Sequence, residues 1–162
     1  MRARILGVVL VGGVLASGAA PGCGYQVGGL YPELDVQVAT FDNVSERRTL
    51  EFELTNAVVH EMIARGFRVN KPGSPLVLRG RILDVRTPPL VGQPDTDAVL
   101  VSSIAVRVEV SLTDAQGHER WKEERLEHVP FTPSRAEDFD TARVKAFDRI
   151  ARWVVTRFEK EW

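Results

Sequence analysis

Residues 104–113 alternate between apolar and polar side chains more clearly than the other segments of this sequence. The apolar residues occupy the even positions, Ile104, Val106, Val108, Val110 and Leu112. A period of two places them all on one face of a β-strand, and an antiparallel sheet commonly packs one face on a core while the other meets water. The segment therefore predicts a strand in a one-sided sheet, whose apolar face needs a second layer to cover it.

Three neighbouring segments predict the rest of the sheet. Residues 34–40 and 76–85 alternate in a similar way. Asp114-Ala115-Gln116-Gly117 has the composition of a tight turn, so residues 118–129 are predicted to return beside the preceding strand. This last strand is dense in charge, which suits an exposed edge, and its carboxylates alternate with Arg and Lys. We expect these charges to pair across strands.

Two amphipathic segments supply the second layer. Residues 49–65 lack Gly and Pro and precede Gly66, which predicts a helix whose buried side carries Phe52, Thr55, Val58, Val59, Met62 and Ile63, flanked by Leu54. Residues 137–161 predict a longer helix with an apolar stripe made by Phe139, Phe147, Ile150, Ala151, Val154 and Phe158. The predicted fold is an α+β two-layer sandwich of order β-α-β-β-β-α. Its mainly antiparallel sheet has four strands, with two helices on one face.

The N-terminus has the features of an export signal. Arg2 and Arg4 precede an uncharged, largely apolar run that is interrupted by glycines and ends in small residues. The run is too short and too rich in glycine for a good membrane-spanning helix. We therefore predict a signal peptide over residues 1–22 and a mature domain over residues 23–162.

Cys23, the one cysteine of the 162 residues, directly follows this signal and cannot form an intramolecular disulfide. The sequence Ala20-Pro21-Gly22-Cys23 resembles the lipobox of bacterial lipoproteins, although Ala20 stands where Leu is usual and Pro21 is atypical. The resemblance implies cleavage before Cys23, followed by S-diacylglycerol and N-acyl attachment to that residue. The alternative is an ordinary signal peptide that leaves a free cysteine.

Several short motifs follow Cys23 in a particular order. Cys23-Gly24-Tyr25-Gln26-Val27 is similar to a CGYxL opening, and residues 36–45 end in an FxNxS pattern at Phe41, Asn43 and Ser45. An ExxLTxA pattern then runs from Glu51 to Ala57, and Trp121 follows the predicted turn at residues 114–117. Together these motifs resemble the LptE family, the lipopolysaccharide-assembly lipoproteins of Gram-negative outer membranes.

The resemblance implies a binding role without catalysis. It implies a lipid-anchored protein of the outer membrane that acts as plug and assembly partner of the LptD β-barrel and contacts lipopolysaccharide (LPS) during its delivery to the cell surface. Only Cys23, as the acylation site, is carried over from the family. An alternative function is that of a periplasmic accessory lipoprotein that regulates a synthase or secretion channel. A small exported hydrolase is disfavoured because no nucleophile and base can be paired.

Two groups of residues are candidate contact sites. Arg79, Arg81 and Arg107 fall on the polar faces of two predicted strands, where they would form a basic patch for LPS phosphates or for acidic groups of the barrel lumen; the alternative is a solvated surface. Leu90 and Val91 are expected at the tip of a proline-rich loop over residues 87–97, which is either an insertion loop for a partner or a plain connector.

Metal, cofactor and nucleic-acid binding are not expected. The three histidines lack the spacing of metal ligands. The formal net charge of −1 gives no general attraction to nucleic acid. The acyl groups on Cys23 are the only non-protein groups that we expect.

Overall fold

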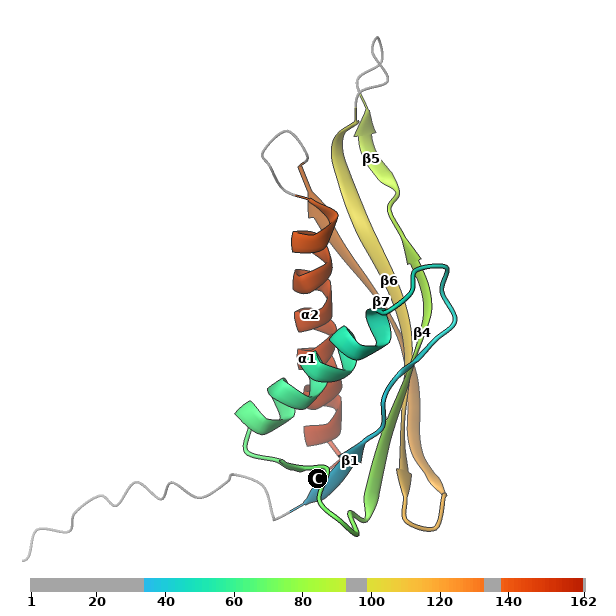
Figure 1. Ribbon diagram of the computed structural model, residues 1–162, viewed down its shortest axis with the longest axis vertical. Coiled ribbons are helices and arrows are strands. Elements are labelled where there is room, and N and C mark those ends of the chain that lie inside the picture. Colours follow the sequence, from blue (N-terminus) through green and yellow to red (C-terminus); the bar gives the residue numbers. More distant parts are fainter. Residues whose placement is uncertain (1–33, 93–98, 133–137, 162) are drawn as a thin grey trace, which may run out of the picture.

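A computed structural model describes residues 34–92, 99–132 and 138–161, so the predicted signal peptide and Cys23 lie outside the described residues. Two helices, α1 (Leu50–Ala64) and α2 (Phe139–Glu159), cover one face of a β-sheet and leave the other face open (Figure 1). The three long strands of the sheet are β4 (Leu76–Arg86), β6 (Val99–Asp114) and β7 (Glu119–Phe131). The α+β two-layer prediction is confirmed.

The sheet is larger than predicted and mixed in direction. The described residues form seven strands where four were expected. β1 (Asp35–Val38) and the three long strands were predicted, and the short strands β2 (Asp42–Asn43), β3 (Arg68–Val69) and β5 (Pro89–Gly92) were not. β4, β6 and β7 are antiparallel neighbours, whereas β1 and β2 run parallel to β4. The parallel part follows from α1, which carries the chain from the β1–β2 segment back to the starting edge, as parallel pairing requires. β2, β3 and β5 have only two to four residues each, and no alternating pattern marked them in the sequence.

The core lies between the sheet and the helices, as the alternation predicted. The even residues of β6 from Ile104 to Leu112 are fully buried, and on β4 so are Leu78 and Ile82. α2 buries the predicted Phe147, Ile150, Ala151, Val154 and Phe158, with Phe139 partly buried. The turn at residues 114–117 closes the β6–β7 hairpin, with Gly117 at a positive φ of 86°.

The face that α1 buries agrees with the prediction at Val58, Met62 and the flanking Leu54 and differs from it elsewhere. Its buried residues are Leu50, Leu54, Val58 and Met62, whereas Phe52 and Ile63 are 60% and 56% exposed. α1 is apolar on two sides, and the sheet and α2 can cover only one of them. Periodicity alone could not choose between two stripes with nearly the same spacing.

α1 ends in a Schellman motif at Gly66, the glycine at which the sequence predicted that the helix would end. Gly66 has a φ of 88°, its N–H donates to the carbonyl of Ile63, and the N–H of Phe67 donates to the carbonyl of Met62. This turn directs Phe67 into the core, where its ring meets the edge of Phe158 with 5.1 Å between centroids.

Candidate functional site

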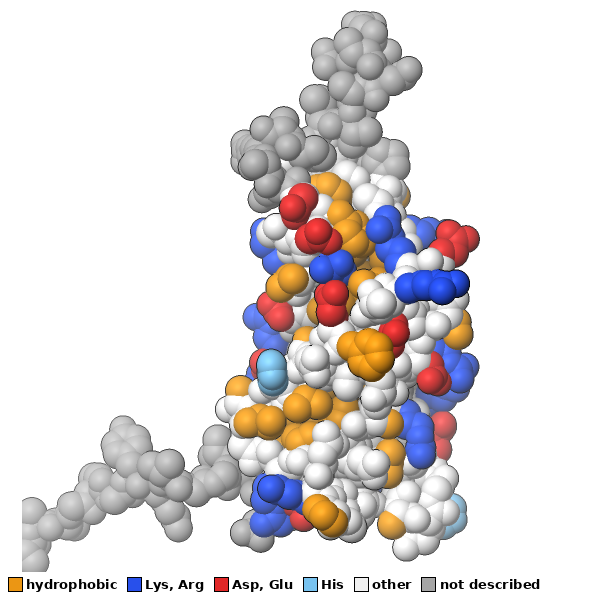
Figure 2. Space-filling view, in the orientation of Figure 1, with side chains coloured by type: hydrophobic (Ala, Val, Ile, Leu, Met, Phe, Trp, Pro, Cys, Tyr) orange, Lys and Arg blue, Asp and Glu red, His pale blue; other side chains and the backbone are white. Residues whose placement is uncertain are grey.

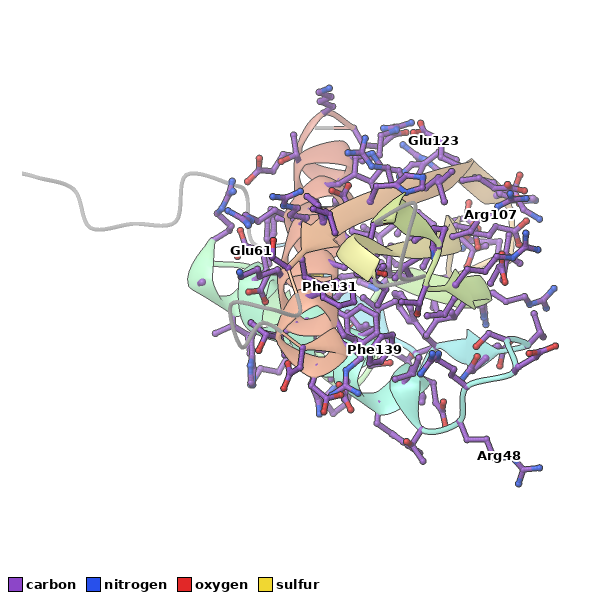
Figure 3. All side chains as sticks on the ribbon, turned by 90° about the horizontal axis from the view of Figure 1, so that it is seen from above. Arg48, Glu61, Arg107, Glu123, Phe131 and Phe139 are labelled. Atoms are coloured by element: carbon purple, nitrogen blue, oxygen red, sulfur yellow. The ribbon has the colours of Figure 1, made fainter. Side chains whose placement is uncertain are left out.

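The open face of the sheet carries the arginines that the sequence singled out. Arg79 and Arg81 on β4 and Arg107 on β6 are all exposed. Figure 3 shows Arg107 on the side of the sheet away from α2. Alternation along the strands explains this, because their neighbours Leu78, Ile82 and Val108 point into the core.

Arg79 and Arg81 border a shallow hollow of about 230 Å³ on this face. The hollow crosses four strands, and its other lining residues are Asp42 on β2, Gly80 on β4, Glu109 and Ser111 on β6, and Lys122 on β7. Three cations and two carboxylates therefore surround one depression.

The charges of this hollow are held only loosely. Arg81 Nη2 lies 3.7 Å from Asp42 Oδ2, and Lys122 Nζ lies 3.0 Å from Glu109 Oε2. Arg79 Nη1 donates to the hydroxyl of Thr113 at 3.0 Å, and within the described residues no carboxylate lies within ion-pair distance of it. Exposed ion pairs contribute about 0–1 kcal/mol each. An incoming phosphate or carboxylate can therefore bind Arg79 and compete for the other two cations at low cost.

Arg107 stands apart from the other two arginines. In the β4–β6 register Arg79 is opposite Ser111 and Arg81 is opposite Glu109, but a bulge between Ile82 and Asp84 then places Asp84 opposite Arg107. Arg107 does not line the hollow, and it has no ion pair within the part of the chain that the structure describes. Two of the three predicted arginines are thus brought together.

Lys122 is the member of the hollow that sequence reasoning missed. It pairs with Ser111, which in turn pairs with Arg79, so the three residues form a row across β7, β6 and β4. Counting residues back from the turn at residues 114–117 would have placed Lys122 next to this row. The prediction instead treated the charges of β7 as a protective edge.

Leu90 and Val91 do not lie at the tip of a loop. They belong to β5, which pairs with the first part of β6, so the insertion-loop expectation is wrong for their backbone. β6 begins at Val99, earlier than the expected Ile104, and this extension supplies the pairing partner. The remainder of the expected loop, residues 93–98, lies outside the described residues.

Several charges of β7 pair with α2 rather than across strands. Glu127 is only 7% exposed, and its carboxylate lies 3.0 Å from Arg125 Nη2 and 3.3 Å from Arg149 Nη1 of α2. Glu123 accepts a hydrogen bond from Arg157, which raises the pKa of that guanidinium further above its ordinary value. The expected cross-strand pairing is confirmed for Lys122 and Glu109. These residues therefore join the sheet edge to the helix layer.

The FxNxS and ExxLTxA motifs meet in space. The Asn43 amide donates to the carbonyl of Arg47 and to the Glu51 carboxylate, while its oxygen accepts from the Ser45 N–H. Thr55 accepts the backbone N–H of Phe41 at 2.9 Å. The bond from Asn43 lowers the pKa of Glu51 below its ordinary value. The motif residues thus fix the β2–α1 connection.

Among the described residues no cluster of three or more His, Cys, Asp or Glu side chains has a metal-binding arrangement. In that same part of the chain neither helix is long and apolar enough to cross a membrane.

Comparison with known proteins identifies related chains by sequence and by fold. The family model LptE, described as lipopolysaccharide-assembly, matches residues 34–158, from β1 nearly to the end of α2. No curated protein matches the sequence.

Several solved structures share the fold. The hypothetical protein CT253 from Chlamydia trachomatis has a TM-score of 0.57 at 15% identity, over 79% of this chain and 96% of that one. The PelC dodecamer from Paraburkholderia phytofirmans has a TM-score of 0.53 at 15% identity, over 76% and 89%. The rare lipoprotein B from Shewanella oneidensis has a TM-score of 0.50 at 18% identity, over 76% and 97%. At these identities the likeness establishes the fold.

Proposed function

The chain belongs to the LptE family of lipopolysaccharide-assembly lipoproteins, and we propose that it binds an LptD-like β-barrel as plug and assembly partner and assists LPS delivery to the cell surface. The family is non-enzymatic, and the proposed role is one of binding. The observation that carries the proposal is the match of the family model over residues 34–158, which include both helices and nearly all of the sheet.

The open face of the sheet is the surface that we assign to the barrel or to LPS. The interior of an outer-membrane barrel is polar. The hollow around Arg79 and Arg81 offers loosely paired charges of both signs, which suits such a wall better than an apolar face would. The planar guanidinium groups also suit bidentate contacts with phosphates, which LPS carries.

Attachment to the outer membrane is proposed to occur through Cys23. Each CH₂ group of a buried acyl chain contributes about 0.8 kcal/mol, and stable anchoring needs more than one chain. A diacylglycerol together with an N-acyl chain meets that requirement. Metabolic labelling with a clickable palmitate tests this step. We expect label on the wild type and none on Cys23→Ala.

Affinity purification of the tagged chain from native membranes tests the proposed partnership. We expect one β-barrel protein of the outer membrane at roughly stoichiometric abundance. Recovery of a synthase or a secretion channel in its place would favour the accessory-lipoprotein alternative and contradict the proposal.

A further inference from the structure

Glu109 is the acidic residue of the hollow that neighbours all three of its cations. In the β4–β6 register it is directly opposite Arg81. It precedes Ser111 by two residues on the same face of β6, and Ser111 is flanked by Arg79 on β4 and Lys122 on β7. Glu109 is therefore diagonal to Arg79 and Lys122. Diagonal neighbours are about 7–8 Å apart, which is within reach of long side chains.

The carboxylate of Glu109 already contacts a cation that an external anion would use. Its Oε2 lies 3.0 Å from Lys122 Nζ, and its side chain is only 22% exposed. The second carboxylate of the hollow, that of Asp42 on β2, is held more loosely, because its side chain is 72% exposed and lies 3.7 Å from Arg81. Figure 2 shows basic and acidic side chains intermixed at the right of the view, where the strands lie. The hollow thus carries its own counter-ion.

Glu109 opposes an anion in the hollow in two ways. The anion competes with the carboxylate of Glu109 for Lys122, and the two negative charges repel each other at short range. Unit charges about 4–6 Å apart change a binding constant by about three- to fivefold even at the dielectric constant of water. A neutral side chain of the same size at residue 109 would remove both effects.

We infer that Glu109 limits the affinity of the hollow for the phosphate groups of LPS by acting as an internal counter-ion. This inference rests on the proposed function, in which the open face of the sheet contacts LPS. Binding is then nearly balanced, because each incoming phosphate breaks the ion pair between Glu109 and Lys122. A bound phosphate leaves readily, which suits a protein that passes LPS on to the cell surface.

Substitution of Glu109 tests the inference through a gain of binding, which damage to the fold would not produce. Glu109→Gln keeps the size of the side chain and removes its charge, whereas Glu109→Asp keeps the charge. Glu124→Gln is the matched control, because Glu124 is exposed and opposite Glu109 on β7 but does not line the hollow. The dissociation constant of the full-length product in detergent is measured by thermophoresis with labelled LPS. The same LPS after removal of its phosphates, and inorganic phosphate as a competitor, are the other probes.

We expect Glu109→Gln to bind LPS at least about threefold more tightly than the wild type does. Glu109→Asp and Glu124→Gln should each show less than about half of that gain, because the first keeps the charge and the second lies outside the hollow. The gain should shrink in about 1 M salt, which screens charges beyond about 3 Å. It should be absent with dephosphorylated LPS.

Three results would overturn the inference and leave the proposed function intact. The first is unchanged or weaker LPS binding by Glu109→Gln while Arg79→Gln combined with Arg81→Gln still weakens it. The second is an equal gain from Glu109→Gln and Glu124→Gln, which would assign the effect to net charge. The third is an equal gain with dephosphorylated LPS, or displacement of LPS by an equimolar amount of inorganic phosphate. If the double arginine variant also binds LPS as the wild type does, the assignment of LPS to the open face falls as well.

Discussion

Gly80 occupies a core-facing position on β4 at which even one added carbon atom is excluded. A Cβ there would overlap the ring of Phe41, which is itself 2% exposed. Overpacking of a tight core costs about 1–3 kcal/mol. We predict that Gly80→Ala lowers the free energy of unfolding by about that amount, measured by urea denaturation.

The control for this prediction removes the obstacle. Phe41→Leu leaves room beside residue 80, so Gly80→Ala should cost less in the Phe41→Leu background than in the wild type. If Gly80→Ala cost the same free energy of unfolding in both backgrounds, overlap with the ring of Phe41 would not be the reason that residue 80 is a glycine.

The hydrogen bond from Asn43 to Glu51 predicts a pH-dependent contribution to stability. Because the folded protein holds the pKa of Glu51 below its ordinary value of 4.5, this contribution is complete above that pH. It is lost as the pH falls through the lowered pKa. Asn43→Ala should therefore destabilise the protein more at pH 7 than at pH 3, as measured by urea unfolding.

Asn56 provides the comparison for the pH experiment, because it is an exposed amide on α1 with no hydrogen bond in the described residues. Asn56→Ala should have the same small effect at both pH values. A cost of Asn43→Ala that is equal at pH 7 and pH 3 would argue against the Glu51 interaction as its source.

The contact between β7 and α2 depends on a nearly buried carboxylate, Glu127. Arg149→Met removes one of its two arginine partners and should lower the free energy of unfolding by about 1–3 kcal/mol, because a poorly compensated buried charge is costly. Arg152→Met is the matched variant three residues along the helix; among the described residues, the guanidinium of Arg152 donates only to the carbonyl of Asp148. It should change stability by less than about 0.5 kcal/mol. Equal effects would refute the role of Glu127 in joining the two elements.

The long elements could be predicted from sequence because a periodic pattern needs several repeats. β6 alternates over five buried positions and α2 repeats its apolar stripe over five turns, so their faces were assigned correctly. α1 has two apolar stripes, and the choice between them depends on how the helix packs against the sheet. Of the residues assigned to the core, Val58 and Met62 are buried, whereas Phe52 and Ile63 are exposed.

The candidate site was only partly predictable for a related reason. Alternation correctly placed Arg79, Arg81 and Arg107 on the open face. Arg107 is set apart from Arg79 and Arg81 by a bulge in β4 near Asp84. Lys122 lines the hollow because the β6–β7 hairpin places it opposite Ser111. Both positions depend on which strands become neighbours, and the sequence of a single strand does not specify its neighbours.

At the scale of the whole molecule, the net charge is negative, so any contact with an anion must be made by a local group of cations. The proposed cleavage before Cys23 would remove Arg2 and Arg4 and change the formal net charge from −1 to −3. A net negative charge repels phosphate-rich LPS, so it opposes binding. We predict that Arg79→Gln combined with Arg81→Gln reduces LPS binding and barrel co-purification more than Arg107→Gln combined with Arg48→Gln, which removes the same charge outside the hollow. Equal losses, or none, would leave the hollow as ordinary solvated surface.

Depletion of this protein in its own cells tests the central claim most directly, with LPS at the cell surface as the readout. The account predicts that surface LPS falls as the protein is lost and returns when the wild-type chain is expressed. Cys23→Ala should restore it less well. Normal surface LPS in fully depleted cells would contradict a role in LPS assembly.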